Sequence, residues 1–305
     1  MQSIARMTAL AAIALTAAGH ATASVQSAAS LSNLTFTLYD IAPDDGVTAS
    51  FSLMGGINPS GSTSTQATVS DTYGLESGTD ALTRAKPFAA RTAGIEIQTG
   101  QAYATVSGYG TSAYGESLAT SGSYQGSASV TSGANNGNPR TSGIELSANS
   151  VLVVQATADV AAEIISTGCT YYYSCYYNND QASAQVSMQL SFSNGGGSGT
   201  STASLSASAA SYGHYEYIYD PVAGVTRATY VPANSADSKS KLLTVIFANN
   251  TDQTQYAMLS LSALVSGTSG TASAGPLDSL PIPVVRSEEH TSELQSRLHL
   301  VCRLL

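Results

Sequence analysis

Residues 185–192 read Gln-Val-Ser-Met-Gln-Leu-Ser-Phe, and this stretch decides the fold class. Its apolar residues, Val186, Met188, Leu190 and Phe192, alternate strictly with Ser and Gln. A period of two places successive side chains on opposite faces of a β-strand, so one face meets a core and the other meets solvent. We therefore predict a half-buried strand whose outer face is polar but uncharged.

The same alternation recurs on both sides of this stretch, and turn-forming residues separate the segments. Strands are predicted within residues 34–39, 47–53, 94–99, 144–158, 203–212, 242–247 and 257–265. Signals for helices are nearly missing. The pattern predicts an all-β protein, and the number of strands favours a two-sheet antiparallel β-sandwich, jelly-roll-like or Ig-like.

Three local expectations are more specific. Pro43-Asp44-Asp45-Gly46 is a strong turn signal, so we expect residues 33–54 to form a hairpin. The apolar run 151–154 is long enough for a strand that is buried on both faces. The strand at 257–265 keeps Leu264 on its inner face only if its register breaks once.

Residues 103–143 differ from the rest, because they consist of Ser, Gly, Ala, Thr and Tyr with almost no large aliphatic residues. One interpretation is thin strands whose small inward residues let two sheets approach closely. The other is a long mobile loop. The tyrosines in this segment favour strands, because a pure linker has little use for so many rings.

The composition limits what the protein can contact. The chain has 305 residues, with 11 Lys+Arg against 20 Asp+Glu, and only 10% of its residues are charged. An ordinary soluble domain has ~25% charged residues, so Ser, Thr, Asn, Gln and Gly must fill the solvent-facing positions. The formal net charge of −9 gives no electrostatic footprint for nucleic acid and no basic stripe for anionic lipid. We therefore expect no nucleic-acid partner.

Residues 1–23 have the features of an export signal peptide. Arg6 precedes an apolar run from Met7 to Ala18 that is too short to span a bilayer. Ala21-Thr22-Ala23 then offers the small residues that signal peptidase needs. We expect cleavage after Ala23 and a mature chain that is secreted or held at the bacterial cell surface, in an oxidising space. The alternative is an N-terminal amphipathic helix of the domain.

The tail, residues 281–305, is distinct from the single β-sandwich domain expected at 24–280. From Arg286 onward the sequence turns suddenly charged, and residues 286–296 are similar to the translation of a widely used sequencing-library adapter. We interpret residues 286–305 as a read-through artefact, with a genuine amphipathic helix as the alternative. We expect no membrane span in the chain as given.

Histidine is too scarce for ordinary acid–base catalysis. Outside the expected signal peptide and tail, His214 is the only histidine in the sequence. Ser-His-Asp and Cys-His sets need a histidine base, and a glycosidase needs two carboxylates in one cleft. No motif links Glu96, Glu145 and Glu163. We expect no catalytic residue, no enzymatic activity and no cofactor.

One group of candidate contact residues lies in a predicted strand at 212–220. On a strand, Tyr215, Tyr217 and Tyr219 share one face, and His214 lies on the other. The three rings could stack on sugar rings. The alternative is that tyrosine supplies β propensity and contact area on an edge strand.

A second group lies in a short loop between two cysteines. In an exported protein, Cys169 and Cys175 are best explained as a disulfide that closes this loop. The loop and its flank carry Tyr171, Tyr172, Tyr173, Tyr176 and Tyr177. These rings could contact a ligand or partner, because tyrosine binds at low entropic cost. The alternative is that they fold back onto the sheet.

Acidic residues near the first turn are a candidate calcium site. Asp40, Asp44 and Asp45 could hold Ca²⁺ together with backbone carbonyls, as loops of β-sandwiches sometimes do. Their spacing is not that of an EF-hand, and the turn alone explains them. We expect no other metal site.

Several segments together resemble exported bacterial proteins of the PEP-CTERM type. The matching segments are the signal peptide, residues 28–34 (AASLSNL), residues 40–46 (DIAPDDG), residues 243–249 (LTVIFAN) and residues 281–285 (PIPVV), which lie where a sorting signal would begin. The chain departs from the family because it has no Pro-Glu-Pro motif and no anchor helix. The resemblance implies surface sorting and association with extracellular polysaccharide, and it supplies no catalytic residue.

We therefore expect an exported, non-enzymatic structural protein of the cell surface or extracellular matrix. The alternative is a carbohydrate-binding module that contacts exopolysaccharide through its tyrosine clusters. A further alternative is an adhesin-like polymer that assembles through exposed sheet edges.

Overall fold

The computed structural model describes residues 24–53, 61–71, 77–84, 88–118, 122–133, 143–165, 180–194, 197–211, 214–222, 224–231 and 233–269. Every regular element within these ranges is a β-strand. The described residues accordingly contain no helix of the length and apolarity that crossing a membrane requires.

Fourteen of the strands form two antiparallel sheets. The first sheet has the order β15 (Ser235–Asn249), β10 (Ser150–Ile165), β1 (Ser24–Asp40), β7 (Gly110–Ser117), β6 (Gly100–Ser107) and β5 (Arg91–Ile97). The second has the order β12 (Gly197–Ser211), β11 (Asp180–Asn194), β16 (Gln255–Ser269), β8 (Gly122–Ser132), β3 (Gly61–Asp71) and β4 (Ser77–Arg84). Short strands β2 (Phe51–Leu53) and β9 (Ile144–Leu146) extend the second sheet beside β16, so we call the two sheets six-stranded and eight-stranded.

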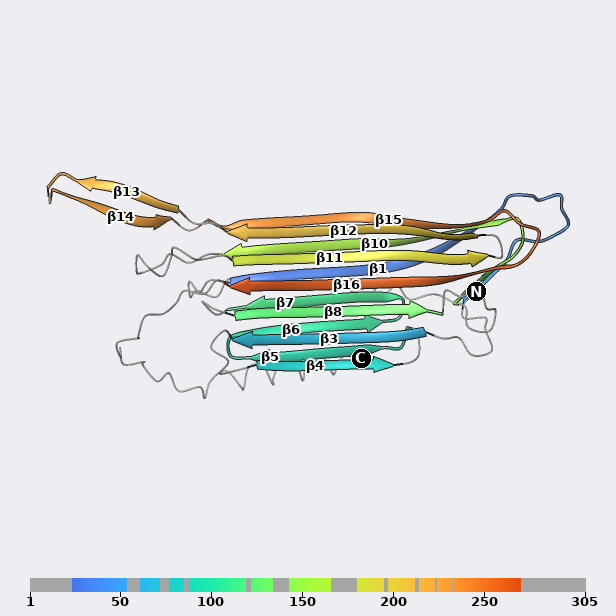
Figure 1. Ribbon diagram of the computed structural model, residues 1–305, viewed down its shortest axis with the longest axis horizontal. Helices are drawn as coiled ribbons and strands as arrows, with labels where there is room; N and C mark the ends of the chain where they lie inside the picture. The colour runs from blue at the N-terminus through green and yellow to red at the C-terminus, as the bar shows by residue number, and fades with distance from the viewer. Residues whose placement is uncertain are drawn as a thin grey trace, which may run out of the picture. The chain divides into compact units, whose positions relative to one another are not determined.

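The two sheets pack face to face, so the predicted all-β sandwich is confirmed. Each strand of one sheet lies next to a strand of the other, from the pair β15 and β12 at one side to the pair β5 and β4 at the other (Figure 1). One cluster of buried apolar residues draws on both sheets. The sandwich therefore has two outer faces and two sides where edge strands meet.

Strand β11 has the register that its sequence predicts. Val186, Met188 and Leu190 are fully buried, and Phe192 packs against the core from its rim. The alternate residues face outward from the eight-stranded sheet. The neighbouring strand β12 follows the same rule, because Ala207 and Ala209 are buried while Ser208 between them is exposed.

Strand β1 begins earlier than the sequence pattern predicts. A β-bulge interrupts the alternation of apolar and polar residues within it. The register against β10 shifts between Ser32 and Thr35, where Asn33 has a φ of 54°. A bulge adds one residue to a strand, which reverses the faces beyond it. Val25 and Leu31, before the bulge, therefore face the core. Leu34, Phe36 and Leu38, after the bulge, face the same side.

The expected hairpin at residues 33–54 is wrong. Strand β1 ends at Asp40, paired with Ser150, whereas β2 pairs with β9 in the other sheet. The connecting loop is bonded to the turn before β10 instead, because Asn149 Nδ2 donates to Asp45 Oδ2 at 2.6 Å. The Pro-Asp-Asp-Gly turn is thus part of a crossing between sheets.

Two further expectations about registers are corrected. The segment 144–158 is broken by a turn at Asn149, and Val151 and Val153 on β10 are only half-buried because the outer face of their sheet is uncovered there. Strand β16 needs no break in register. Leu264 points outward and is 37% exposed, while Ala263 and Val265 occupy the core.

The core changes character along the strands. At one end, which we call the bulky end, Leu152, Leu190, Phe247 and Leu259 are fully buried. The rings of Phe192 and Phe247, from opposite sheets, stack with centroids 5.0 Å apart. Aromatic and aliphatic side chains therefore separate the sheets at this end.

The other end, which we call the small-residue end, is filled mainly by Ala, Ser and Gly. The low-complexity segment lies here as strands β6, β7 and β8, so the interpretation as strands is correct for residues 103–107, 110–117 and 122–132. A Cβ on Gly126 of β8 would lie 2.9 Å from the backbone oxygen of Tyr103 in the facing sheet. The small residues thus allow the two backbones to approach closely.

One large side chain crosses the small-residue end. Tyr124 of β8 is 3% exposed and occupies space left open by Gly115 in the facing sheet and Gly267 in its own. Its hydroxyl lies 2.8 Å from Ser27 Oγ of β1. Ser117 and Ser269 make a second hydrogen bond between the sheets, at 3.1 Å. Polar contacts therefore join the sheets where aliphatic packing is thin.

Candidate functional site

Five carboxylate and carboxamide side chains form a row across the outer face of the six-stranded sheet. Antiparallel pairing places in register, from β10 to β5, the residues Glu163, Gln26, Glu116, Gln101 and Glu96. Adjacent strands are roughly 4.8 Å apart, so the row runs across the strands and covers about 19 Å. We call it the Glu/Gln row.

Hydrogen bonds hold the Glu/Gln row in place. Gln26 Nε2 donates to Glu163 Oε2 at 2.7 Å, and Gln101 Nε2 donates to Glu116 Oε2 at 2.8 Å. Each bond joins neighbouring strands, and each uses one carboxylate oxygen. The side chains are therefore positioned before any ligand arrives.

Two tyrosines lie in the next row, one strand apart. Tyr114 of β7 and Tyr103 of β6 are directly opposite each other on neighbouring strands, and both are partly exposed. The Tyr114 hydroxyl donates to Glu116 Oε2 at 2.9 Å, and the Tyr103 hydroxyl donates to Glu96 Oε2 at 3.3 Å. We call Tyr103 and Tyr114 the tyrosine pair.

The ring of Tyr103 lies against the neighbouring strand. A Cβ on Gly94 of β5 would be 2.7 Å from Tyr103 Cδ1 and 2.9 Å from Cε1. The missing side chain at Gly94 is what lets the ring cover the strand instead of standing away from it. An aromatic ring held in this way presents a broad apolar surface beside polar groups.

Both hydroxyls of the tyrosine pair stay protonated near neutral pH. Burial is the largest cause that raises the pKa of Tyr114, and the hydrogen bond and negative charge of Glu116 add to it. Burial likewise raises the pKa of Tyr103, and the charge of Glu96 acts in the same direction. The pair therefore donates hydrogen bonds and does not act as a base.

The tyrosines singled out in the sequence lie in a separate hairpin. Strands β13 (His214–Asp220) and β14 (Val225–Val231) pair with each other and with no other described strand. Tyr217 and Tyr219 share a face, as expected, and are 63% and 61% exposed. The side chains of His214 and Tyr215 lie outside the described part.

The expected cysteine loop lies outside the described residues. This holds for Cys169 and Cys175 and for the five tyrosines expected to be contact residues, Tyr171, Tyr172, Tyr173, Tyr176 and Tyr177. The expected signal peptide and C-terminal tail lie outside the described residues as well. These expectations stay predictions.

The carboxylates of the candidate calcium loop are engaged in local hydrogen bonds. Asp40 Oδ1 accepts from the Ala42 N–H at 3.0 Å, and Asp45 Oδ1 accepts from the Val47 N–H at 2.7 Å. The bond from Asn149 is the largest cause that lowers the pKa of Asp45. Within the described ranges, no three His, Cys, Asp or Glu side chains gather in a way that could hold a metal ion.

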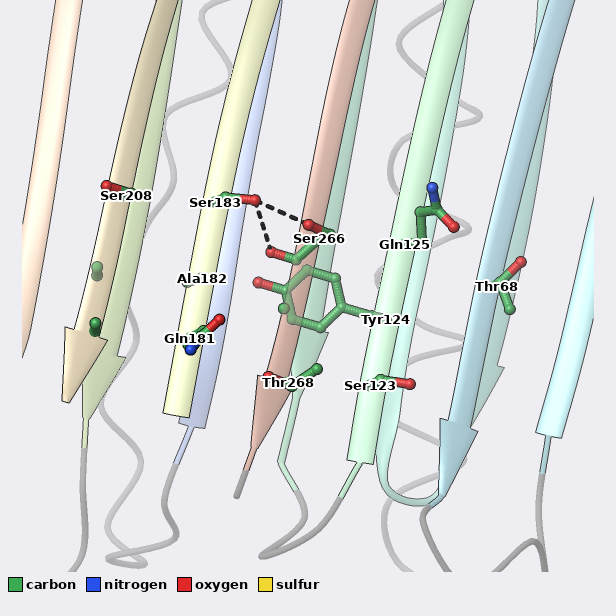
Figure 2. Close-up of a pocket in the computed structure, with 13 residues that line it drawn as sticks. Thr68, Ser123, Tyr124, Gln125, Gln181, Ala182, Ser183, Ser208, Ser266 and Thr268 are labelled. Carbon is green, nitrogen blue, oxygen red and sulfur yellow. Dashed lines mark hydrogen bonds between the residues drawn. The ribbon is translucent and has the colours of Figure 1, made fainter. Parts of the chain in front are cut away.

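A shallow hollow of about 540 Å³ lies on the opposite, eight-stranded sheet. Hydroxyl and amide side chains from β3, β8, β11, β12 and β16 line it, and Ser183 and Ser266 are joined by a 2.8 Å hydrogen bond (Figure 2). Its lining includes Thr68, Ser123, Tyr124, Gln125, Gln181, Ser208 and Thr268. Tyrosine is the only ionisable residue type in this lining, so the hollow itself offers no acid–base pair.

Comparisons with known proteins add no assignment. No protein-family model, no curated protein and no solved structure matches the chain.

The sequence missed the most organised surface of the described chain. Glu96 and Glu163 were visible as isolated acids, and Tyr103 and Tyr114 as rings in a low-complexity segment. Their alignment depends on which strands are neighbours, and it joins residues up to 137 positions apart. The one available signal was that Tyr114 and Glu116 are two residues apart, which places them on the same face of a strand.

Proposed function

We propose that the chain is an exported, non-catalytic scaffold protein of the cell surface or extracellular matrix that binds polysaccharide. The binding surface is the outer face of the six-stranded sheet at the small-residue end. The observation that carries the proposal is the position of the tyrosine pair directly beside the Glu/Gln row.

Sugars present apolar C–H faces together with a ring of hydroxyls, so they need both kinds of contact. The tyrosine pair provides adjacent aromatic surface. The Glu/Gln row provides amide donors and carboxylate acceptors at regular intervals. A surface that is open on all sides suits a polymer chain better than a small molecule, which is usually enclosed in a pocket.

Preorganisation favours binding on this surface. The hydrogen bonds of Glu96, Glu116 and Glu163 fix side chains that would otherwise lose rotamer freedom on contact with a ligand. The resemblance to exported proteins of the PEP-CTERM type, with their implied link to extracellular polysaccharide, supports the same location and partner.

The hairpin tyrosines are the competing surface for the same function. Tyr217 and Tyr219 are more exposed than the tyrosine pair. The hydroxyls of the tyrosine pair, however, donate to Glu96 and Glu116, which belong to a row of polar side chains aligned across five neighbouring strands. We therefore assign the binding to the tyrosine pair.

The test compares two double substitutions that each remove two tyrosine rings. Tyr103→Ala/Tyr114→Ala removes the pair, and Tyr217→Ala/Tyr219→Ala is the matched control on the hairpin. Binding is measured by pull-down on insoluble cellulose and chitin and by affinity electrophoresis in xylan and mixed-linkage glucan. We expect at least one polymer to retain the wild type and the hairpin variant, and the pair variant to bind about tenfold more weakly.

Two outcomes would overturn the proposal. Equal retention of the wild type and the folded pair variant would remove the tyrosine pair from the binding surface. Failure of the wild type to bind any polymer of this panel would remove polysaccharide binding itself.

A further inference from the structure

The sandwich has two sides where edge strands of the opposing sheets lie next to each other. On one side these are β12 and β15, each 15 residues long, and on the other they are β4 and β5, of 8 and 7 residues (Figure 1). An edge strand presents unpaired backbone N–H and C=O groups to which another chain can add a strand. A long edge offers more such groups than a short one, so β12 and β15 carry the greater risk.

On the long side, β15 carries charged residues on the face that it turns toward the other sheet, where the side chains of Asp237 and Lys239 remain 30% and 49% exposed. Asp237 and Lys239 of β15 continue the alternating row that Leu243, Val245 and Phe247 occupy further along the same strand. Lys241 follows them on the same row, so three charged residues occupy successive positions here, although only 10% of the residues in the chain are charged. Inward-pointing charges are one of the devices by which natural sheets discourage edge pairing.

These two side chains bind the backbone of the opposite edge. The Ser208 N–H of β12 donates to Asp237 Oδ2 at 3.2 Å, and Lys239 Nζ donates to the Ser206 carbonyl at 3.0 Å. Lys239 Nζ also lies 2.7 Å from Asp237 Oδ2, so the two charges neutralise each other. We call this arrangement the Asp–Lys clip.

Side chains of β12 in turn bind backbone groups of β15 and of the segment just before it. The Ile246 N–H of β15 donates to Ser201 Oγ of β12 at 3.1 Å. Ser211 Oγ at the end of β12 donates to the Ala233 carbonyl just before β15. Backbone groups on both long edges are therefore satisfied by side chains of the other sheet.

The short side has a simpler version of the same device. Asp80 Oδ2 of β4 accepts from the Gly94 N–H of β5 at 2.9 Å. A carboxylate from the edge of one sheet thus caps an edge N–H of the other sheet on both sides of the sandwich.

We propose that the long side is a latent surface for strand pairing with a second copy of this chain, and that the Asp–Lys clip keeps it closed. A strand added to β12 would need the Ser208 N–H and the Ser206 carbonyl, and both are taken by the clip. It would also have to displace two charges. The inference does not depend on polysaccharide binding.

The test removes the clip without changing the net charge. Asp237→Ser/Lys239→Ser deletes one acid and one base and introduces the residue that is already common on these strands. The matched control, Asp220→Ser/Arg227→Ser, makes the same charge-neutral change at the 3.2 Å ion pair of the hairpin formed by β13 and β14. Sedimentation velocity is recorded over a range of concentrations for the mature chain, and circular dichroism checks the fold.

The clip variant should form dimers and larger species as concentration rises, while the wild type and the control stay monomeric. A folded clip variant that stays monomeric over the whole range would overturn the proposal, and so would equal association of the control. Should the clip variant fail to fold, Asp237→Ser alone breaks the bond to Ser208 and is predicted to associate in the same assay. A folded, monomeric single variant would also contradict the proposal.

Discussion

The bulky end and the small-residue end of the sandwich reach the same architecture by different means. At the bulky end, stacked rings and aliphatic side chains such as Phe247 and Leu152 fill a wide gap between the sheets. At the small-residue end, Ala and Gly bring the backbones close, and hydrogen bonds such as that of Tyr124 with Ser27 cross the narrow gap. Apolar burial holds one end together, and close fit holds the other.

The difference matters for function because the tyrosine pair lies at the small-residue end. Its backbone packs directly on Gly126 of the facing sheet, so the outer surface there rests on a thin, closely fitted layer. Closely packed interiors do not deform easily. The predictions below test whether the two ends respond to substitution as these two modes of packing require.

The largest effect is expected at the bulky end. Phe247→Ala removes a fully buried ring that stacks on Phe192, and we expect the free energy of unfolding to fall by about 3–5 kcal/mol. Its neighbour Ile246 is 47% exposed, so Ile246→Ala should cost less than about 1 kcal/mol. Urea denaturation of both variants measures the contrast, and equal losses would contradict the assignment of faces.

At the small-residue end we expect a smaller loss in the free energy of unfolding, caused by adding atoms to the core instead of removing them. Gly115→Ala adds one methyl group that would overlap the ring of Tyr124, and overpacking of this kind costs about 1–3 kcal/mol. The same substitution in a Tyr124→Leu background should cost less, because the ring is gone. The double-mutant cycle tests this coupling. Strictly additive losses would show that the ring and the glycine do not meet.

The smallest effect concerns the Tyr124 hydroxyl and depends on pH. Tyr124→Phe leaves Ser27 without its partner at neutral pH, at a cost of about 1 kcal/mol. Burial raises the pKa of Tyr124 above its ordinary value of 10.0. The folded protein therefore resists ionisation, and the stability linked to the protonated hydroxyl, present below pH 10, is lost as pH rises above it. Unfolding at pH 9 and pH 11 should show a larger decline for the wild type than for the Phe variant.

The sequence was most informative where one strand determines the answer. The alternation in residues 185–192 predicts the faces of β11, because a period of two needs no knowledge of neighbours. Asn33 shows the limit of this reasoning. Its bulge shifts the register of β1, and nothing in the alternation of residues 34–38 indicates that the strand continues back to Ser24.

The candidate site depended on pairing that the sequence does not reveal. Glu163 and Gln26 are adjacent because β10 pairs with β1, and Glu116 joins them because β7 pairs with the other edge of β1. Long-range register of this kind depends on the whole core. The tyrosines chosen from the sequence, such as Tyr217, stand out because several lie close together along the chain. The tyrosine pair is recognised only from the glutamates that lie beside it in the folded sheet.

The most direct test of the account is to locate a bound oligosaccharide on the folded protein. We would titrate the ¹⁵N-labelled protein with a soluble hexasaccharide of the polymer that retains it, and follow the backbone amide shifts by NMR. The account predicts that the shifts concentrate in residues 101–105 and 112–116, on the strands of the tyrosine pair. Shifts confined to the hairpin at 214–231, or to the hollow on the eight-stranded sheet, would contradict it.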